Sequence, residues 1–262
     1  MTRIQRILRL PGRLAFRAAL PLRRLWRRRA PETAAPPPAG LVRFGDLRRL
    51  EPLSREWGLD RGGPLDRYYI ESFLERHRKD VHGRVLEVAE DVYSRWFGGS
   101  DVDRIDILQY REGEHPRAAF TGDITDAPHL PDDTFDCVII TQTLQLIYDV
   151  PAAIRTIHRI LEPGGVVLIT VPGISQVNRQ DIETWGDSWC WSFTKLSLAR
   201  LLAERFPETA IDVRAHGNVL VAAGFLYGMG RDDLSGRELD VHDPDYELLI
   251  TGWARKPVES GS

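Results

Sequence analysis

Between residues 83 and 165, short runs of β-branched residues alternate with acidic or turn residues, and this pattern limits the possible folds more than any other feature. The stretch between the last two runs begins at Pro151 and stops at Glu-Pro-Gly-Gly, as expected for one helix over residues 151–161. This order predicts a doubly wound, Rossmann-like α/β domain, in which a mostly parallel seven-stranded sheet has helices on both faces. The expected strands are residues 84–89, 103–109, 118–120 and 135–141 in this region and residues 166–171 directly after it.

The flanking segments complete the predicted domain. Tyr69, Phe73 and Leu74 recur at helical spacing, so a helix is expected over residues 66–81, and residues 193–206 predict another. The expected closing strands are residues 211–213, 218–225 and 246–253. We divide the chain into a basic tail with a proline-rich linker, a helical lead-in that caps the site, and the main domain: residues 1–40, 41–82 and 83–257.

The tail differs from the rest of the chain in charge. Residues 1–29 interleave ten arginines with Ile, Leu and Trp, and residues 30–40 are proline-rich. The tail is therefore strongly basic in a chain whose net charge is −3, so the remainder is acidic. One interpretation is an interfacial anchor on an anionic membrane surface. The other is a disordered arm, or a start codon assigned upstream of Leu41. Nucleic-acid binding is not expected, because the acidic body would repel phosphates.

Three acids lie at or near the ends of successive expected strands. Glu87 lies within the first strand, Asp106 lies near the end of the second, and Asp123 follows the third in the segment TGDI. Ligands of open parallel sheets bind beyond the carboxyl ends of the strands, so these acids would meet at one site. Each acid alone is better explained as a helix cap or a solvated turn. Together with the segment LEPGG they indicate a binding site.

This order of strands, acids and LEPGG resembles that of the class I S-adenosylmethionine-dependent methyltransferases. The segments RGGPLDRYY and WGDSWCWSFT also resemble those of bacterial methyltransferases associated with surface-glycan synthesis. The resemblance implies that Asp106 accepts the ribose hydroxyls of S-adenosylmethionine and that Asp123 accepts the adenine amino group, with Ile124 against the ring. The cofactor-binding residues that it implies are Glu87, Ala89, Asp91, Tyr93, Asp106, Asp123, Ile124, Thr141 and Arg67. The implied substrate-binding residues are Tyr68, Trp185, Asp187 and Trp189.

The loop after the first strand departs from that family. The family usually has VLE-x-G-x-G-x-G, and this chain has VLEVAEDVY. Glycines in this loop let the backbone approach the methionine part of the cofactor, so the bulkier residues leave two interpretations. In the first, Asp91 pairs with the amino group of the cofactor and Tyr93 flanks it. In the second, Glu90 and Asp91 close the pocket and the domain binds no cofactor.

The expected function is S-adenosylmethionine-dependent methyl transfer to an oxygen of a sugar or glycan intermediate. The alternative is a non-catalytic methyltransferase-like scaffold in a glycan-assembly complex. Asp187 and His216 are candidate catalytic bases by location only. No metal is expected, because the segment HDPD at residues 242–245 is better explained as a turn. An NAD enzyme is disfavoured because G-x-G-x-x-G is absent.

The expected location is cytoplasmic, with peripheral contact at the inner face of the membrane. Two cysteines do not make a disulfide framework and fit a reducing compartment. No apolar run reaches the ~20 residues that span a bilayer.

Overall fold

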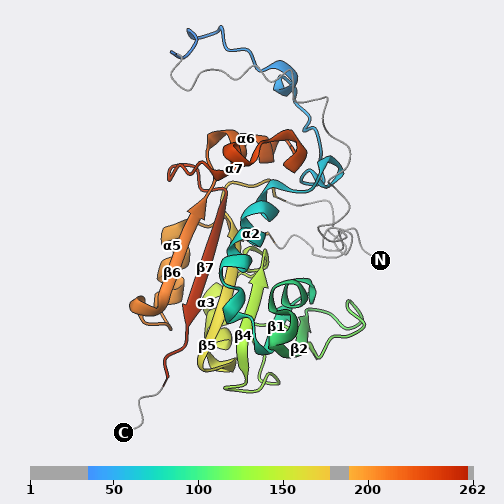
Figure 1. The fold of residues 1–262 in the computed structure, drawn as a ribbon, viewed down its shortest axis with the longest axis vertical. Helices are drawn as coiled ribbons and strands as arrows, with labels where there is room; N and C mark the ends of the chain where they lie inside the picture. Colours follow the sequence, from blue (N-terminus) through green and yellow to red (C-terminus); the bar gives the residue numbers. More distant parts are fainter. Residues whose placement is uncertain (1–34, 178–188, 259–262) are drawn as a thin grey trace. The chain divides into compact units, whose positions relative to one another are not determined.

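The structure is a computed structural model that describes residues 35–177 and 189–258. The chain divides into two units, Met1–Pro52 and Leu53–Ser262, which we describe separately. The described part of the first unit contains the short 3-10 helix η2 (Gly45–Leu47). The second unit contains the sheet, its helices and every candidate site residue that the structure describes (Figure 1).

The described residues of the second unit form a seven-stranded sheet with the order β3-β2-β1-β4-β5-β7-β6. Strands β1 to β5 pair in parallel, and β7 runs antiparallel to both of its neighbours, β5 and β6. The carboxyl ends of β1 to β6 therefore share one side of the sheet, here named the carboxyl edge, and their starts lie at the amino edge. This confirms the predicted doubly wound, Rossmann-like α/β fold. The strands are β1 (Gly83–Val88), β2 (Val102–Gln109), β3 (Phe120–Thr121), β4 (Phe135–Thr141), β5 (Leu161–Pro172), β6 (Ile211–His216) and β7 (Leu249–Arg255).

Helices cover both faces of this sheet (Figure 1). On one face, α2 (Leu65–Arg76), α6 (Val219–Leu226) and α7 (Gly236–Asp240) bury apolar residues against β1, β4 and β5. On the other face, α3 (Val150–Ile160) and α5 (Lys195–Ala203) do the same. The short helices of this unit are η3 (Leu59–Arg61), η4 (Arg78–Asp80), the π-helix η5 (Ser94–Gly98), η6 (Gly99–Asp101), η7 (Leu144–Leu146), η8 (Glu208–Ala210) and η9 (Arg231–Asp233).

The helix starts follow local sequence signals. The side chain of Asp149 accepts a hydrogen bond from the backbone N of Ala152 at 2.9 Å, and Pro151 occupies the first turn of α3. Thr194 and Ser197 cap the start of α5 reciprocally, each side chain accepting from the other's backbone N. Such caps satisfy N–H groups that the first helical turn leaves unpaired, so they fix where each helix begins.

The sequence predicts a strand over residues 218–225, but Asn218 caps helix α6 and the residues after it lie in that helix, so the prediction is wrong. Asn218 Oδ1 accepts from the backbone N of Leu220 at 3.0 Å and of Val221 at 3.1 Å. Its Nδ2 donates to the carbonyl oxygen atoms of Glu238 and Val241. The apolar run contains two alanines and no alternation of polar and apolar residues, so the cap decides in favour of a helix.

The segment LEPGG lies inside β5, because this strand begins at Leu161 directly after α3. The register between β4 and β5 changes from Phe135 opposite Leu161 to Cys137 opposite Val166, which marks a bulge. Gly164 adopts a φ of +94°, a left-handed conformation that favours glycine. The glycines of this segment therefore shape the start of a strand.

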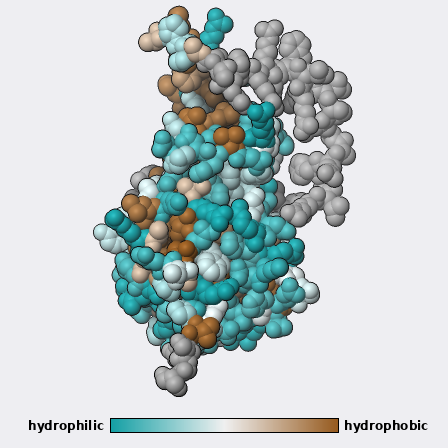
Figure 2. Space-filling view, turned by 60° about the vertical axis from the view of Figure 1, so that its left-hand side comes forward, coloured by the Kyte–Doolittle hydropathy of each residue, from teal (hydrophilic) through white to brown (hydrophobic). Residues whose placement is uncertain are grey.

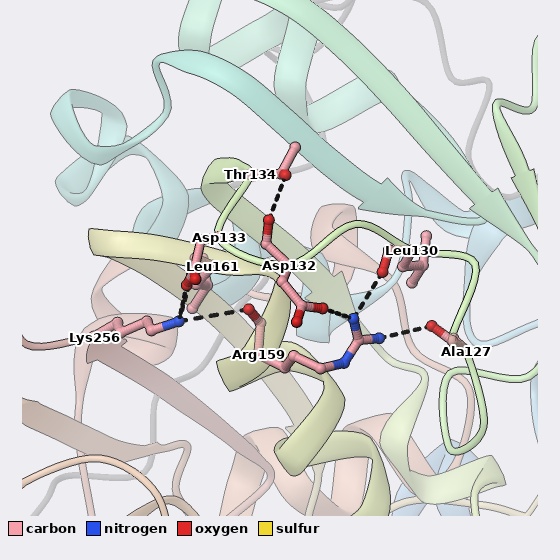
Figure 3. Close-up of polar contacts among 8 residues, drawn as sticks. All are labelled: Ala127, Leu130, Asp132, Asp133, Thr134, Arg159, Leu161 and Lys256. Atoms are coloured by element: carbon pink, nitrogen blue, oxygen red, sulfur yellow. Dashed lines mark hydrogen bonds and ion pairs between the residues drawn. The ribbon is translucent and has the colours of Figure 1, made fainter.

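At the amino edge, Arg159 ties α3 to the segment between β3 and β4 (Figure 3). Its Nη1 donates to the carbonyl oxygen of Leu130 at 2.7 Å and contacts the carboxylate of Asp132. Its Nη2 donates to the carbonyl oxygen of Ala127 at 2.7 Å. One guanidinium group thus fixes a segment that also carries Asp123.

Lys256 completes this cluster, which we name the amino-edge clamp (Figure 3). Its Nζ donates to the carboxylate of Asp133 at 2.5 Å and to the carbonyl oxygen of Leu161 at 2.8 Å. The same nitrogen lies 3.5 Å from the carbonyl oxygen of Arg159, in the last turn of α3. A cation at a helix C-terminus is stabilising, because the final carbonyl groups carry partial negative charge.

Within residues 35–177 and 189–258, no helix combines the length and the apolar character needed to cross a bilayer. The face drawn in Figure 2 is largely hydrophilic, and its apolar residues gather in the narrow upper part and in a patch at the left of the body.

Candidate active site

The turn after β1 is built around the carboxylate of Glu87, which is 2% exposed. Its Oε2 accepts from the backbone N of Ser94 at 2.7 Å and from Ser94 Oγ at 2.6 Å, and its Oε1 accepts from Tyr93 N at 3.1 Å. Burial raises the pKa of Glu87 to about 7, although these hydrogen bonds oppose the rise. Glu87 therefore caps η5 and shapes the turn from inside.

Ala89 takes the place of a glycine in this turn and keeps a glycine-like conformation, with a φ of +73°. Its backbone N donates to the carbonyl oxygen of Leu108 at 2.8 Å. An L-residue in the left-handed region costs roughly 1–2 kcal/mol. Gln142, which directly follows the neighbouring strand β4, is also left-handed, with a φ of +49°. Backbone strain of this kind concentrates at functional sites, and here it lies after two adjacent central strands.

The two acids of this turn are buried, and Asp91, which stands at a glycine position of the family motif, is paired with two arginines. Asp91 Oδ2 contacts Arg95 Nε at 2.7 Å and Arg117 Nη2 at 2.6 Å. Glu90 Oε2 lies 3.8 Å from His115 Nε2. His115 and Arg117 come from the segment between β2 and β3. The structure thus engages Asp91 with two arginines, whereas the sequence analysis assigns it to the amino group of the cofactor.

The start of α2 contacts the same turn through Arg67. Its Nη1 donates to the hydroxyl of Tyr93 at 2.7 Å. Burial opposes the charge of Arg67, but Tyr93 and Asp66 outweigh it and raise the pKa of the guanidinium group. Burial raises the pKa of Asp66, whose Oδ1 is buried without a hydrogen-bond partner. Arg67 therefore keeps its positive charge beside the β1 turn.

Asp106 lies within β2 near its end, at the position that the sequence analysis gives it. It precedes the end of β2 at Gln109 by three residues and is 2% exposed. Its carboxylate contacts Arg84 Nε at 2.7 Å and Arg104 Nε at 2.9 Å. These two cations compensate a buried charge, so the observed role of Asp106 is to pair strands β1 and β2.

Asp123, Ile124 and Thr141 lie at the carboxyl edge as predicted from their positions after or at the ends of strands. Asp123 follows β3, is exposed, and accepts from the backbone N of Thr125 at 2.9 Å. Ile124 is 5% exposed and packs in the main core. Thr141 is the last residue of β4 and is half-buried. Their roles toward a cofactor remain predictions.

The predicted substrate residues fall into two groups. Trp185 and Asp187 lie outside the described residues. Tyr68 is half-buried, and its hydroxyl donates to the carboxylate of Asp240 in α7, a contact that raises its pKa to about 12. Trp189 is half-buried, with a buried Nε1 that has no hydrogen-bond partner.

His216, a candidate base by location, lies away from the β1 turn. It ends β6, which is separated from β1 by three strands, or roughly 19 Å at about 4.8 Å per strand. Its Nε2 lies 2.9 Å from Thr251 Oγ1, and its ring lies 5.5 Å from that of Tyr69. Burial and nearby cations lower its pKa to about 4, so the ring is neutral and weakly basic at pH 7.

The sequence analysis missed several polar side chains at the ends of β4 and β5. Gln142 Nε2, Gln145 Oε1 and Thr170 Oγ1 are buried without hydrogen-bond partners in the described structure. The available signal was a polar segment, TQTLQL, directly after the apolar strand FDCVII. Polar residues at that position face the carboxyl edge of an open sheet, where ligands bind.

Two exposed aromatic residues adjoin these polar groups. The rings of Tyr148 and Trp191 stack with centroids 5.6 Å apart, and their side chains are 78% and 40% exposed. Trp191 Nε1 donates to the carbonyl oxygen of Ile147 at 2.9 Å, which fixes the indole. The backbone N of Trp191 donates to the carbonyl oxygen of Gln145 at 3.2 Å. The pair is therefore anchored beside the end of β4.

The candidate site gives no indication of a metal centre. Across the parts of the chain that the structure describes, no three His, Cys, Asp or Glu residues are placed to hold a metal ion.

Comparison with known proteins identifies relatives of this domain. The chain is 30% identical to phosphoethanolamine N-methyltransferase 3 from Arabidopsis thaliana over 152 residues, which are 50% of this chain and 27% of that protein. It is 31% identical to malonyl-[acyl-carrier protein] O-methyltransferase from Serratia marcescens over 85 residues, 32% of this chain and 30% of that protein. The chain thus spans less than a third of the length of these curated relatives.

A solved structure and a family model complete the comparison. The crystal structure of an S-adenosylmethionine-dependent methyltransferase from Mesorhizobium loti is 16% identical, with a TM-score of 0.48 over 76% of this chain and 100% of that chain. The family model described as methyltransferase domain matches residues 67–205. Because this match covers just over half of the chain, the protein belongs to the methyltransferase domain family, and its sheet has the Rossmann-like fold of the S-adenosylmethionine-dependent methyltransferases.

Proposed function

We propose that this protein binds S-adenosylmethionine at the carboxyl edge and transfers its methyl group to a hydroxyl of a sugar or glycan intermediate. One observation carries the choice of acceptor. The exposed, stacked pair of Tyr148 and Trp191 adjoins the unpartnered polar atoms at the ends of β4 and β5. Aromatic rings beside a few polar groups suit a sugar, whose faces are apolar and whose rim carries hydroxyls.

The residues around the β1 turn fit the cofactor. Bound S-adenosylmethionine supplies an electrophilic methyl group on a sulfonium centre. The left-handed Ala89 keeps the backbone path of a glycine turn, and Arg95 and Arg117 offset the charge of Asp91. Arg67 would bind the carboxylate of the cofactor, and Asp123 would accept from the adenine amino group. These residues bind and orient, which is the main requirement of an in-line methyl transfer.

The scaffold alternative depends on Glu90 and Asp91 closing the pocket. Both acids are buried, and Asp91 is paired with Arg95 in η5 and with Arg117 in the segment between β2 and β3. Glu90 Oε2 lies 3.8 Å from His115 Nε2 in the same segment. Because both side chains are engaged by groups of the protein, we favour an enzyme over a scaffold.

Methyl transfer from isotopically labelled S-adenosylmethionine tests the acceptor class. Purified protein is incubated with lipid-linked glycans, and in parallel with phosphoethanolamine as an amine control. We expect label in the glycan fraction as a base-stable methyl ether. Label in the amine, with none in the glycan, would overturn the proposed acceptor.

We also propose that residues 1–29, which lie outside the described residues, bind an anionic membrane surface at the cytoplasmic face. Ten arginines interleaved with apolar residues support this, since each basic residue near such a surface contributes about 1 kcal/mol. Co-sedimentation with vesicles of phosphatidylserine and phosphatidylcholine should be lost in a chain that starts at Leu41. Equal binding of both chains at low salt would refute the anchor.

A further inference from the structure

We propose that Gln142, Gln145, Thr170 and Trp189 form the subsite that binds the acceptor hydroxyl, and that this subsite selects an alcohol over an ammonium group or a carboxylate. The inference rests on the proposed O-methyl transfer and names the residues that would give it specificity. It is carried by four buried polar atoms that have no hydrogen-bond partner.

The four atoms are Gln142 Nε2, Gln145 Oε1, Thr170 Oγ1 and Trp189 Nε1. They account for four of the six such side-chain atoms among the described residues. Buried polar groups in folded proteins are nearly always hydrogen-bonded, so a concentration of unpaired ones calls for an explanation. A ligand that completes these bonds is one explanation, because each missing bond then favours binding.

Backbone contacts bring these residues together. The backbone N of Gln142 donates to the carbonyl oxygen of Thr170 at 2.8 Å. Gln145 Nε2 donates to the carbonyl oxygen of Gln142 at 2.8 Å. The carbonyl oxygen of Gln145 accepts from Cys190 N at 2.8 Å, and Cys190 directly follows Trp189. Three segments therefore meet at the carboxyl edge, after β4, near the end of β5 and before α5.

The side chains of the proposed subsite differ in how deeply they are buried. Gln145 is 2% exposed and Thr170 is fully buried, so they form its floor. Gln142 and Trp189 are half-buried, with their unpaired nitrogen atoms on the buried side. Gln142 is also the left-handed residue at the end of β4, so its backbone position is fixed by the sheet behind it.

The chemistry of the unpaired atoms identifies the ligand group. Because Gln145 Nε2 already donates to a carbonyl oxygen, its free atom is the acceptor Oε1. The free atoms of Gln142 and Trp189 are donors. A hydroxyl can donate to Gln145 and accept from Gln142 at the same time. An ammonium group has no lone pair for the donors, and a carboxylate has no proton for Gln145, so the pair of glutamines favours a neutral hydroxyl over either ion.

Two threonines provide a matched test. Thr170 in β5 and Thr251 in β7 are paired across the antiparallel ladder, and both are buried. Thr251 Oγ1 already has a partner, His216 Nε2 at 2.9 Å, whereas Thr170 Oγ1 has none. Valine has nearly the same shape as threonine. Removing an unpaired buried hydroxyl should leave stability unchanged or raise it, and removing a paired one should lower stability.

The experiment measures binding of methyl α-D-mannopyranoside, as a hydroxyl-rich probe, by NMR titration in the presence of saturating S-adenosylhomocysteine. We expect Thr170→Val to bind the probe at least fivefold more weakly at an unchanged or higher melting temperature. Thr251→Val should melt at a lower temperature and bind the probe as the wild type does. Gln142→Met should also lower the affinity for the probe and leave the affinity for S-adenosylhomocysteine unchanged.

Two results would overturn the proposal, and they differ in what else they refute. If the wild type binds the probe and Thr170→Val and Gln142→Met bind it equally well, the subsite is wrong and the proposed function stands. If the wild type binds S-adenosylhomocysteine but not the probe, both the subsite and the sugar acceptor are wrong.

Discussion

The two edges of the sheet differ in how well their polar groups are satisfied. At the amino edge, the clamp of Arg159 and Lys256 gives carbonyl and carboxylate groups a cationic partner, and none of its side-chain atoms is among the buried unpaired ones (Figure 3). At the carboxyl edge, the described residues include two left-handed non-glycine residues, against one, Asp133, in the clamp, and they also include a buried carboxylate with a raised pKa and four unpaired polar atoms.

We interpret this difference as a division of roles: the amino edge maintains the fold, and the carboxyl edge binds the cofactor and the acceptor. Features that cost stability persist where function requires them, and substitutions that relieve them commonly stabilise a protein. Relief of strain at the carboxyl edge should therefore raise stability, whereas loss of a side chain at the amino edge should lower it. Three predictions follow this contrast from the largest expected effect to the smallest.

The largest effect concerns Glu87 and pH. Burial raises its pKa from 4.5 to about 7 in the folded state, so the folded protein binds more protons than the unfolded chain between these values. The stabilising contribution of Glu87 is complete below pH 4.5 and is lost as pH rises through 7, a change on the order of 3 kcal/mol. We expect the stability of the wild type relative to Glu87→Gln to fall by that order from pH 4.5 to 8, as measured by urea unfolding. A difference that stays constant with pH would show that Glu87 is not buried as described.

The second prediction concerns the amino-edge clamp. Arg159→Ala removes donors from two backbone carbonyl groups and from Asp132, and should lower the free energy of unfolding by about 2 kcal/mol. Arg155→Ala is the control, because Arg155 lies in the same helix, is half-exposed and contacts Asp149 only at 3.9 Å. Its effect should stay within about 0.5 kcal/mol. If both variants lost the same free energy of unfolding, the proposed stabilising role of the amino-edge clamp would be wrong.

The smallest of the three concerns Ala89. Ala89→Gly relieves a left-handed alanine and should stabilise the protein by about 0.5–1 kcal/mol in the same assay. Ala199→Gly in α5 is the matched control and should destabilise by about 1 kcal/mol. Destabilisation by Ala89→Gly would mean that the turn gains more from the alanine methyl group than it loses in strain.

Much of the fold could be predicted from local sequence signals. The strand at residues 135–141 was identified with its observed bounds, and Pro151 placed α3 to within one residue. Both elements have a clear pattern of apolar residues, and their tertiary contacts favour the same secondary structure as their local sequence does. Residues 218–225 are uniformly apolar, so the pattern could not distinguish a strand from a helix, and the side chain of Asn218 decided.

The site was less predictable, because its features depend on neighbours in space. Asp106 looked like a strand-end acid, yet Arg84 on the adjacent strand and Arg104 two residues before it enclose its carboxylate. The sequence did indicate the contact with Arg104, since residues i and i+2 of a strand share a face. The unpaired atoms of Gln142 and Thr170 could not be found from sequence, because hydrogen bonds that are absent leave no sequence pattern.

Calorimetric titration with S-adenosylhomocysteine tests most directly whether the carboxyl edge binds the cofactor despite its glycine-poor turn. We expect the wild type to bind, Asp123→Ala to bind at least tenfold more weakly, or about 1.4 kcal/mol, and Asp106→Asn to keep its affinity while losing stability. Asp123 is exposed at the end of β3, whereas Asp106 is enclosed by two arginines, so only the former is free to meet a ligand. A wild-type protein that gives no heat with excess ligand would contradict the account and favour the non-catalytic scaffold.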